Sequence, residues 1–262
     1  MLQSIYRLLI ELTNGKWTSA MLHKFANSKS SKIIIPSFAK IYGISQDEME
    51  KPLEEYESLH HFFIRNLKPG SRTIEEEPLS IVSPVDSIIE DIGEISAAKT
   101  ITVKGKVYSI SEMLGNEEAM ARYEQGKYMI FYLSPSHYHQ IHSPVAGDVI
   151  NQWTLGRKSY PVNKLGLTYG NNPLSKNFRK ITEIKHHSGT MAVIKVGAMF
   201  VNSIETTYTG TSLKKGERMA YFTFGSTVVL LFEKGTVNLL PNITLPYPIK
   251  YGEKIGTLVG QE

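Results

Sequence analysis

Three histidines lie close together in the stretch YLSPSHYHQIHSP, residues 132–144. An unperturbed imidazole titrates near neutral pH and both takes up and releases protons, so it suits acid–base chemistry. Alternate residues of a strand share a face, which would place His137 beside His139, and a turn would bring His139 toward His142. The cluster indicates proton transfer. A structural role and a zinc site are the alternatives, although no HExxH motif or second ligand group accompanies it.

Asp86, in the stretch VSPVDSII, is the second candidate for chemistry. It lies between a proline-containing turn and an apolar run. A carboxylate in such a place could orient a histidine and stabilise its cation. The alternative is a local role, because aspartate side chains often hydrogen-bond their own backbone in turns.

The third candidate is Gly225-Ser226, which interrupts the strand-like run FTFGSTVVLL, residues 222–231. Glycine inside a strand marks a bulge or a close approach of another group. A serine hydroxyl becomes a nucleophile when a base lies within reach. No G-x-S-x-G motif surrounds Ser226, so an α/β-hydrolase is not expected. On the residues alone, a bulge with a polar side chain facing outward stays open.

The elements that must position these residues are mainly strands. From about residue 81, short β-prone runs alternate with turn signals, and only residues 111–123 clearly predict a helix. Residues 83–95 resemble residues 143–156, and residues 214–225 resemble residues 250–260. Such internal similarity is typical of the hairpin halves of a biotinyl- or lipoyl-like sandwich. We expect an α+β fold, with a mainly antiparallel sandwich or barrel-like core and an N-terminal helical subdomain.

The N-terminal part has the spacing of short amphipathic helices. We expect them over residues 1–13, from Trp17 to Phe25, from Ile33 to a stop at Gly43, and over 58–67 with Ser58 as N-cap. Residues 1–40 also carry six basic residues against one acidic residue, a local charge of +5 in a chain of net charge +4. A basic, amphipathic end indicates either a subdomain packed on the core or a surface that meets anionic lipid.

Composition excludes several kinds of site. The chain of 262 residues has no cysteine, which rules out disulfides, thiolate catalysis and cysteine-ligated metal centres. No window reaches the roughly 18 apolar residues of a membrane-spanning helix. No signal peptide is expected, because Arg7 and Glu11 interrupt the early apolar run.

Taken together, the motifs resemble those of the phosphatidylserine decarboxylases, a family of self-processing pyruvoyl enzymes. Six motifs occur in the family's order: FFIRNLKPGSR, SPVDS, VKGKVYSISEMLG, YLSPSHYHQIHSPVAG, VGAMFVNSI and FGST. The resemblance runs from about Phe62 to Gly256. Ser87 stands where the family usually has glycine, Phe224 where it has leucine, and KNFR (176–179) departs from its usual pattern.

The resemblance implies that Ser226 attacks the carbonyl of Gly225 and that the chain splits there into a β chain, 1–225, and an α chain, 226–262. Ser226 would become a covalent pyruvoyl group, which forms a Schiff base with the serine headgroup of phosphatidylserine and yields phosphatidylethanolamine. His142 would be the base that activates Ser226, Asp86 would orient His142, and His139 would return the proton. No metal is implied.

The resemblance also implies how the chain is organised and what it meets. Residues 1–67 would form a helical membrane-docking region and 68–262 a β-rich catalytic domain. The expected partner is phosphatidylserine in an anionic membrane, and the two chains of one precursor would stay associated. The protein would be peripheral and lie on the cytoplasmic face of the membrane. Nucleic acid is not an expected partner, and a homo-oligomer is left open. The rival functions are a zinc-dependent β-sandwich hydrolase using His137, His139 and His142, and a membrane-binding module without activity.

Overall fold

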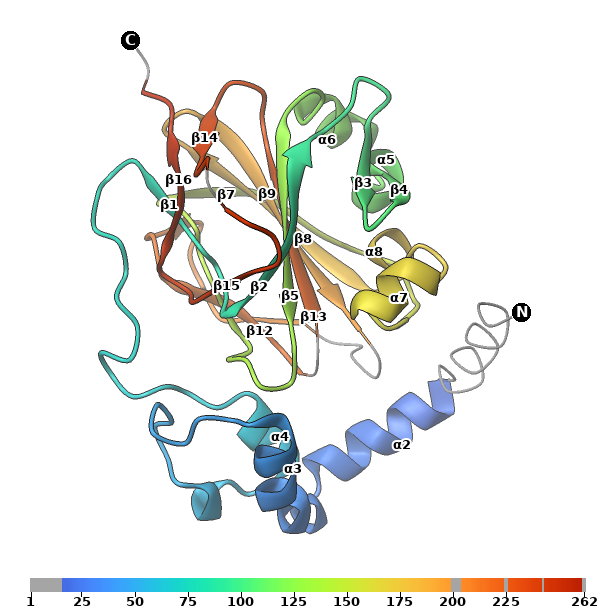
Figure 1. Ribbon diagram of the computed structural model, residues 1–262, viewed down its shortest axis with the longest axis vertical. Coiled ribbons are helices and arrows are strands. Elements are labelled where there is room, and N and C mark those ends of the chain that lie inside the picture. The colour runs from blue at the N-terminus through green and yellow to red at the C-terminus, as the bar shows by residue number, and fades with distance from the viewer. Residues whose placement is uncertain (1–15, 199–203, 224–225, 242, 261–262) are drawn as a thin grey trace.

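The computed structural model describes residues 16–198, 204–223, 226–241 and 243–260. Its centre is an antiparallel eight-stranded sheet in the order β11-β7-β8-β9-β13-β5-β2-β15 (Figure 1). The strands are, in that order, Ser212–Leu213, Gly147–Leu155, Arg179–His186, Gly189–Gly197, Ser226–Phe232, Lys127–Leu133, Ser87–Glu94 and Tyr247–Ile249. The fold is therefore the α+β arrangement with a mainly antiparallel core that the sequence predicts.

Two three-stranded sheets lie over one face of this large sheet. One has the order β10-β12-β6 and the other β1-β16-β14. The first sheet consists of β10 Ile204–Thr206, β12 Arg218–Phe222 and β6 Gln140–His142. The second consists of β1 Ser80–Val82, β16 Lys254–Leu258 and β14 Val237–Leu239. Side chains of all three sheets form one continuous apolar core, which includes Phe131, Met219 and Ile255.

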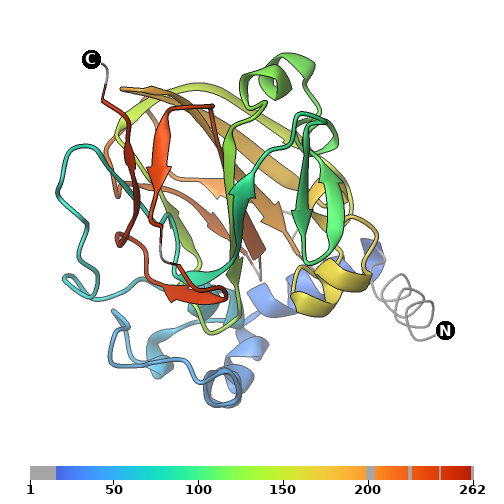
Figure 2. The ribbon, with the colours of Figure 1, turned by 45° about the horizontal axis from the view of Figure 1, so that its top comes forward.

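The other face of the large sheet carries the hairpin β3–β4 and four short helices (Figures 1 and 2). A second core fills this layer and includes Tyr108, Leu174 and Val229. The elements are β3 Thr100–Val103, β4 Lys106–Ser109, α5 Ile110–Leu114, α6 Glu117–Arg122, α7 Lys164–Tyr169 and α8 Pro173–Lys176. The one helix predicted over 111–123 is thus two helices, because Gly115 adopts a left-handed conformation (φ 59°) and Asn116 caps the second.

The N-terminal helices lie together at one end of the β domain (Figure 1). They are α2 Lys16–Asn27, η1 Lys29–Ile34, α3 Ile35–Tyr42, η2 Leu53–Glu55 and α4 Leu59–Phe63, with a small core of their own around Phe62. Gly43 ends α3 at φ 61° and Ser58 caps α4, as expected. Helix α4 ends at Phe63 and not at Leu67, and the helix expected over 1–13 lies outside the described residues.

Strand β13 is the most enclosed strand of the large sheet. All seven of its residues are buried, and it pairs along its whole length with β5 on one side and β9 on the other. Its side chains alternate between the two cores, with Val228 and Leu230 in the first and Val229 in the second. By this alternation Ser226, the first residue, shares the face of Val228 and Leu230. The position of Ser226 is therefore fixed from both sides.

Truncating Leu230 should measure how much β13 stabilises the fold. Leu230→Ala leaves a cavity at a fully buried site, so the free energy of unfolding should fall by about 2–5 kcal/mol. Val107→Ala, at a side chain of β4 that is 58% exposed, should change it by less than about 0.5 kcal/mol. Urea denaturation of both variants in an uncleaved Ser226→Ala background compares them, and equal losses would contradict the assignment.

Candidate functional site

Ser226 begins β13 and carries a buried hydroxyl. Its backbone pairs with Leu133 of β5 and Gly197 of β9. The residue is fully buried, and Oγ makes no hydrogen bond within the described part of the chain. Buried hydroxyls are usually satisfied, so an unpaired one at a chain position held this firmly suggests a reactive group. Gly225 and Phe224 lie outside the described residues.

The histidine motif is connected to the region of Ser226 through two strands, β5 and β12. It leaves β5 after Leu133, the partner of Ser226, and then pairs in β6 with β12, the strand that precedes β13. The carbonyl of His139 accepts a hydrogen bond from the backbone N–H of Phe222, four residues before Ser226. The segment that carries the histidines is thus tied to both strands that flank the Gly225-Ser226 bond.

His142 is held in the form of a base. Its Nδ1 lies 2.8 Å from the carbonyl oxygen of Gly216, and a carbonyl only accepts, so Nδ1 carries the proton and Nε2 the lone pair. Nε2 is buried and makes no hydrogen bond within the residues described. Burial, the main cause, lowers the pKa of His142 to about 4, so the neutral imidazole dominates at neutral pH. Its ring stacks on Tyr251 with centroids 3.9 Å apart.

His139 is arranged in the same way. Its Nδ1 donates to the carbonyl of His137 at 2.9 Å, which leaves a buried Nε2 without a hydrogen-bond partner in the described chain. Burial first, and the nearby guanidinium of Arg65 second, lower the pKa of His139 well below its usual value. His137 itself accepts a hydrogen bond at Nδ1 from the backbone N–H of Ser134, which closes the turn between them. His137 therefore shapes the loop, and His139 carries a buried lone pair on Nε2 that no hydrogen bond engages within the described chain.

Asp86 lies near His142 but makes no hydrogen bond to it. Arg72 holds the carboxylate of Asp86 through Nε at 3.1 and 3.2 Å and Nη2 at 2.5 Å. The backbone N–H of Tyr251 donates to the same carboxylate at 2.9 Å. Tyr251 also stacks on His142, so Asp86 reaches the imidazole through Tyr251. The direct orienting role expected for Asp86 stays a prediction.

Arg72 and Tyr251 are functional candidates that sequence reasoning missed. Arg72 joins Asp86 to Glu48 of the N-terminal region, and Glu48 also meets Lys250 beside Tyr251. A cavity of about 460 Å³ opens at this network and reaches the loop of His137. Nothing local marks these residues, since their partners lie far away in the sequence.

The described residues contain no group of three or more His, Cys, Asp or Glu side chains placed to hold a metal ion. The histidines of the motif use their Nδ1 atoms on backbone and hydroxyl groups instead. The zinc hydrolase alternative is not favoured.

Comparison with known proteins decides the family. The family model of phosphatidylserine decarboxylase matches residues 59–257. Proteins named phosphatidylserine decarboxylase proenzyme from Bacillus thuringiensis (strain Al Hakam) and Bacillus cereus (strain 03BB102) are each 56% identical over 257 residues, 98% of both chains compared. The one from Bacillus mycoides (strain KBAB4) is 55% identical over 262 residues, the whole of both chains. The chain belongs to the phosphatidylserine decarboxylase family.

The buried, neutral histidines of this family member should make its stability depend on pH. A histidine whose pKa is lowered by folding binds protons first in the unfolded state, so stability falls as pH drops below about 6.5. With a folded pKa of about 4, His142 accounts for a loss of about 2 kcal/mol between pH 7 and pH 5.

His142→Gln should therefore reduce the pH-dependent loss of stability by about that amount. His186→Gln should also reduce it, because burial lowers the pKa of His186 to about 4. Urea denaturation at pH 7 and pH 5, in the uncleaved Ser226→Ala background, measures both. An unchanged pH dependence in His142→Gln would show that this imidazole is not held neutral.

Proposed function

We propose that this protein decarboxylates phosphatidylserine to phosphatidylethanolamine after it has cleaved its own chain between Gly225 and Ser226. The observation that carries the proposal is the buried hydroxyl of Ser226, which has no hydrogen-bond partner in the part of the chain that the structure describes, at the first residue of the central strand in a chain of this family. The proenzyme names of the relatives are consistent with cleavage.

The cleavage needs Ser226, its neighbour Gly225, one base and one water molecule. Oγ of Ser226 attacks the Gly225 carbonyl, and the peptide bond becomes an ester as the amide nitrogen takes up a proton. Loss of the Cα proton of Ser226 then breaks the Cβ–Oγ bond and leaves Oγ in the new carboxylate of Gly225. Hydrolysis of the remaining enamine releases ammonia and leaves a pyruvoyl group on residue 226.

His142 is the base in this proposal, because Nε2 is neutral, buried and unpaired in the described chain. Asp86 acts by holding the neighbouring Tyr251 segment in place. A pyruvoyl group would supply a carbonyl that condenses with the substrate amine and accepts electrons as carbon dioxide leaves. The proton returned to the product passes through Nε2 of His139, since Nδ1 is engaged by the carbonyl of His137.

The two chains should stay together after cleavage. Three strands of the α chain, 226–262, pair with strands of the β chain. Strand β13 pairs with β5 and β9, β15 pairs with β2, and β16 pairs with β1. These ladders and the shared core keep residue 226 between Leu133 and Gly197 without a covalent link. No further subunit is required for this arrangement.

Fragment masses test the cleavage. Wild-type protein should give two fragments under denaturing mass spectrometry, 1–225 with a free carboxylate and 226–262 with a blocked N-terminus. Ser226→Ala should leave one intact chain, and His142→Ala should slow cleavage by at least about 100-fold, in the range usual for loss of a general base. His187→Ala, at an exposed position, is the control. An intact wild-type chain would refute the proposal.

Residues 1–67 are proposed as the membrane-docking region and 68–262 as the catalytic domain. Among the described residues, no helix has the length and apolar character needed to span a membrane. Large apolar side chains of the helices instead face outward: Met21, Ile33 and Ile41 are 72%, 84% and 77% exposed. Lys24, Lys29, Lys32 and Lys40 belong to the same helices. Such a surface suits peripheral binding to anionic lipid, and we place it on the cytoplasmic face.

Binding to vesicles tests the docking region. Ile33→Ser with Ile41→Ser should weaken binding to phosphatidylserine-containing vesicles about tenfold or more, since two apolar side chains no longer enter the interface. Raising the salt concentration should weaken wild-type binding, because each lysine near the membrane contributes roughly 1 kcal/mol. Val107→Ser, at an exposed apolar side chain of the β domain, is the control in a flotation assay. Equal binding by all three proteins would refute this docking surface.

A further inference from the structure

The last residue of helix α4 and the two residues after it pack against the loop that carries His139. The Phe63 ring lies against the His139 ring with centroids 3.9 Å apart. The carbonyl of Ile64, the next residue, accepts a hydrogen bond from the side chain of Gln140 at 2.7 Å. Three consecutive residues, Phe63 to Arg65, therefore contact the histidine loop, although about 75 residues separate them in sequence.

Arg65 makes the most specific of these contacts. Its Nη2 donates to the carbonyls of Ser136 and His137 at 2.8 and 3.0 Å. The carbonyl of His137 is also the acceptor for Nδ1 of His139. One oxygen thus receives both the guanidinium and the imidazole. This shared acceptor fixes the ring orientation and the tautomer of His139, and with them the direction of Nε2.

The burial of Arg65 indicates that this contact matters. Arg65 is only 4% exposed, and its Nε and Nη1 atoms are buried without a hydrogen-bond partner in the described chain. Leaving charged donors without hydrogen bonds in a buried place costs free energy. Burial lowers the pKa of Arg65 to about 10, so the side chain stays charged at neutral pH.

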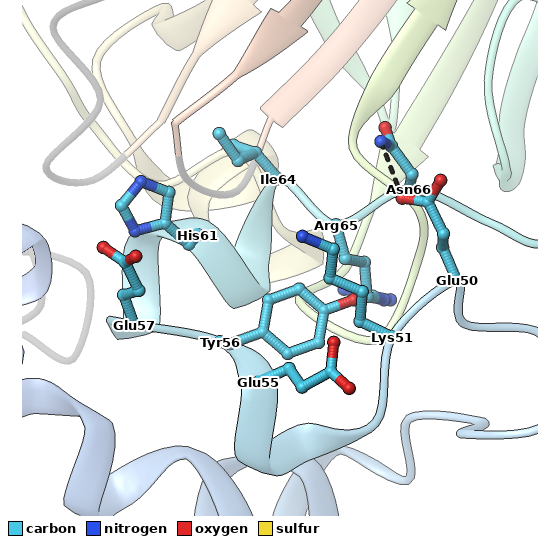
Figure 3. A pocket seen from close by; sticks show the side chains of 9 residues that line it. All are labelled: Glu50, Lys51, Glu55, Tyr56, Glu57, His61, Ile64, Arg65 and Asn66. Atoms are coloured by element: carbon cyan, nitrogen blue, oxygen red, sulfur yellow. Dashed lines mark hydrogen bonds between the residues drawn. The ribbon is translucent and has the colours of Figure 1, made fainter.

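Arg65 also lies between the histidine loop and the outside. It lines a cavity of about 290 Å³ together with Lys51, Tyr56 and Asn66. Figure 3 shows its side chain at the back of this cavity, with the Tyr56 ring and Lys51 in front of it. Lys51 is a basic residue that lines the same cavity, and the side-chain hydrogen bonds to the carbonyls of Ser136 and His137 come from Arg65, which makes Lys51 a matched control.

We propose that Arg65 is a positioning residue for the decarboxylation step, acting with Phe63 from the end of the docking region to hold His139 through the carbonyl of His137. The inference rests on the proposed function, in which His139 returns the proton. It adds that the docking region supplies part of the catalytic apparatus and is more than an attachment to the membrane.

The test compares Arg65→Gln, Arg65→Lys and Lys51→Gln in the full-length protein, with rates divided by the fraction of cleaved chain. For Arg65→Gln we expect kcat on phosphatidylserine in mixed micelles to fall at least tenfold with little change in KM. The guanidinium is a cation that lowers the pKa of His139, so its loss should also move the limb of the kcat–pH profile that His139 controls to higher pH. His137, the other titratable group against His139, remains in all variants.

Arg65→Lys keeps the charge and one donor, so its pH profile should match the wild type while kcat falls by a smaller factor. Lys51→Gln should match the wild type in both. A wild-type kcat and pH profile in Arg65→Gln, with cleavage and decarboxylation intact, would overturn the inference and leave the proposed function standing. If Arg65→Gln does not fold, Arg65→Lys decides, and an unchanged kcat in that variant overturns the inference.

Discussion

The pairing of β13 on both sides is the constraint on which the rest of the structure depends. In the proposed cleavage, Ser226 attacks the carbonyl of the preceding residue. Such an attack requires that the serine is held still while the backbone on its N-terminal side bends toward it. Strand β13 provides the rigid half, since β5 and β9 pair with every residue from Ser226 to Phe232. The same ladders would keep residue 226 in place after the chain is cut. In the proposed function, one arrangement thus serves both the formation and the use of the reactive group.

Burial sets the chemistry around this strand. His139 and His142 are each tied through Nδ1 to a backbone carbonyl, and each keeps an unpaired Nε2 within the described chain. Desolvation then favours the neutral imidazole, which is the form that takes up a proton. Asp86 is fully engaged by Arg72 and by Tyr251 in the uncut chain. The carboxylate therefore acts as an anchor for the ring that stacks on His142.

The sequence predicts the parts of this site that are local. Gly-Ser-Thr inside an apolar run marked the start of β13, and the histidine motif marked the loop that holds His139 and His142, the two proposed proton carriers. Strand β8 and helices α7 and α8 were missed, because their residues lack a clear period of two or 3.6. Arg65, Arg72 and Tyr251 were missed for another reason. Their roles come from partners 14 to 165 residues away, and no local pattern records such contacts.

Two arginines join the N-terminal region to the proposed site in the β domain. Arg72 connects Glu48 to Asp86, and Arg65 connects the end of α4 to the loop of His139. Arg72 thus places its guanidinium against the carboxylate of Asp86, and Arg65 places its guanidinium against the carbonyl of His137. A docking region joined only by a flexible linker would bring the enzyme to lipid without affecting its chemistry. Here a displacement of α4 would move the carbonyl that holds His139, so the position of the proposed docking helices is coupled to the geometry of the proposed proton transfer.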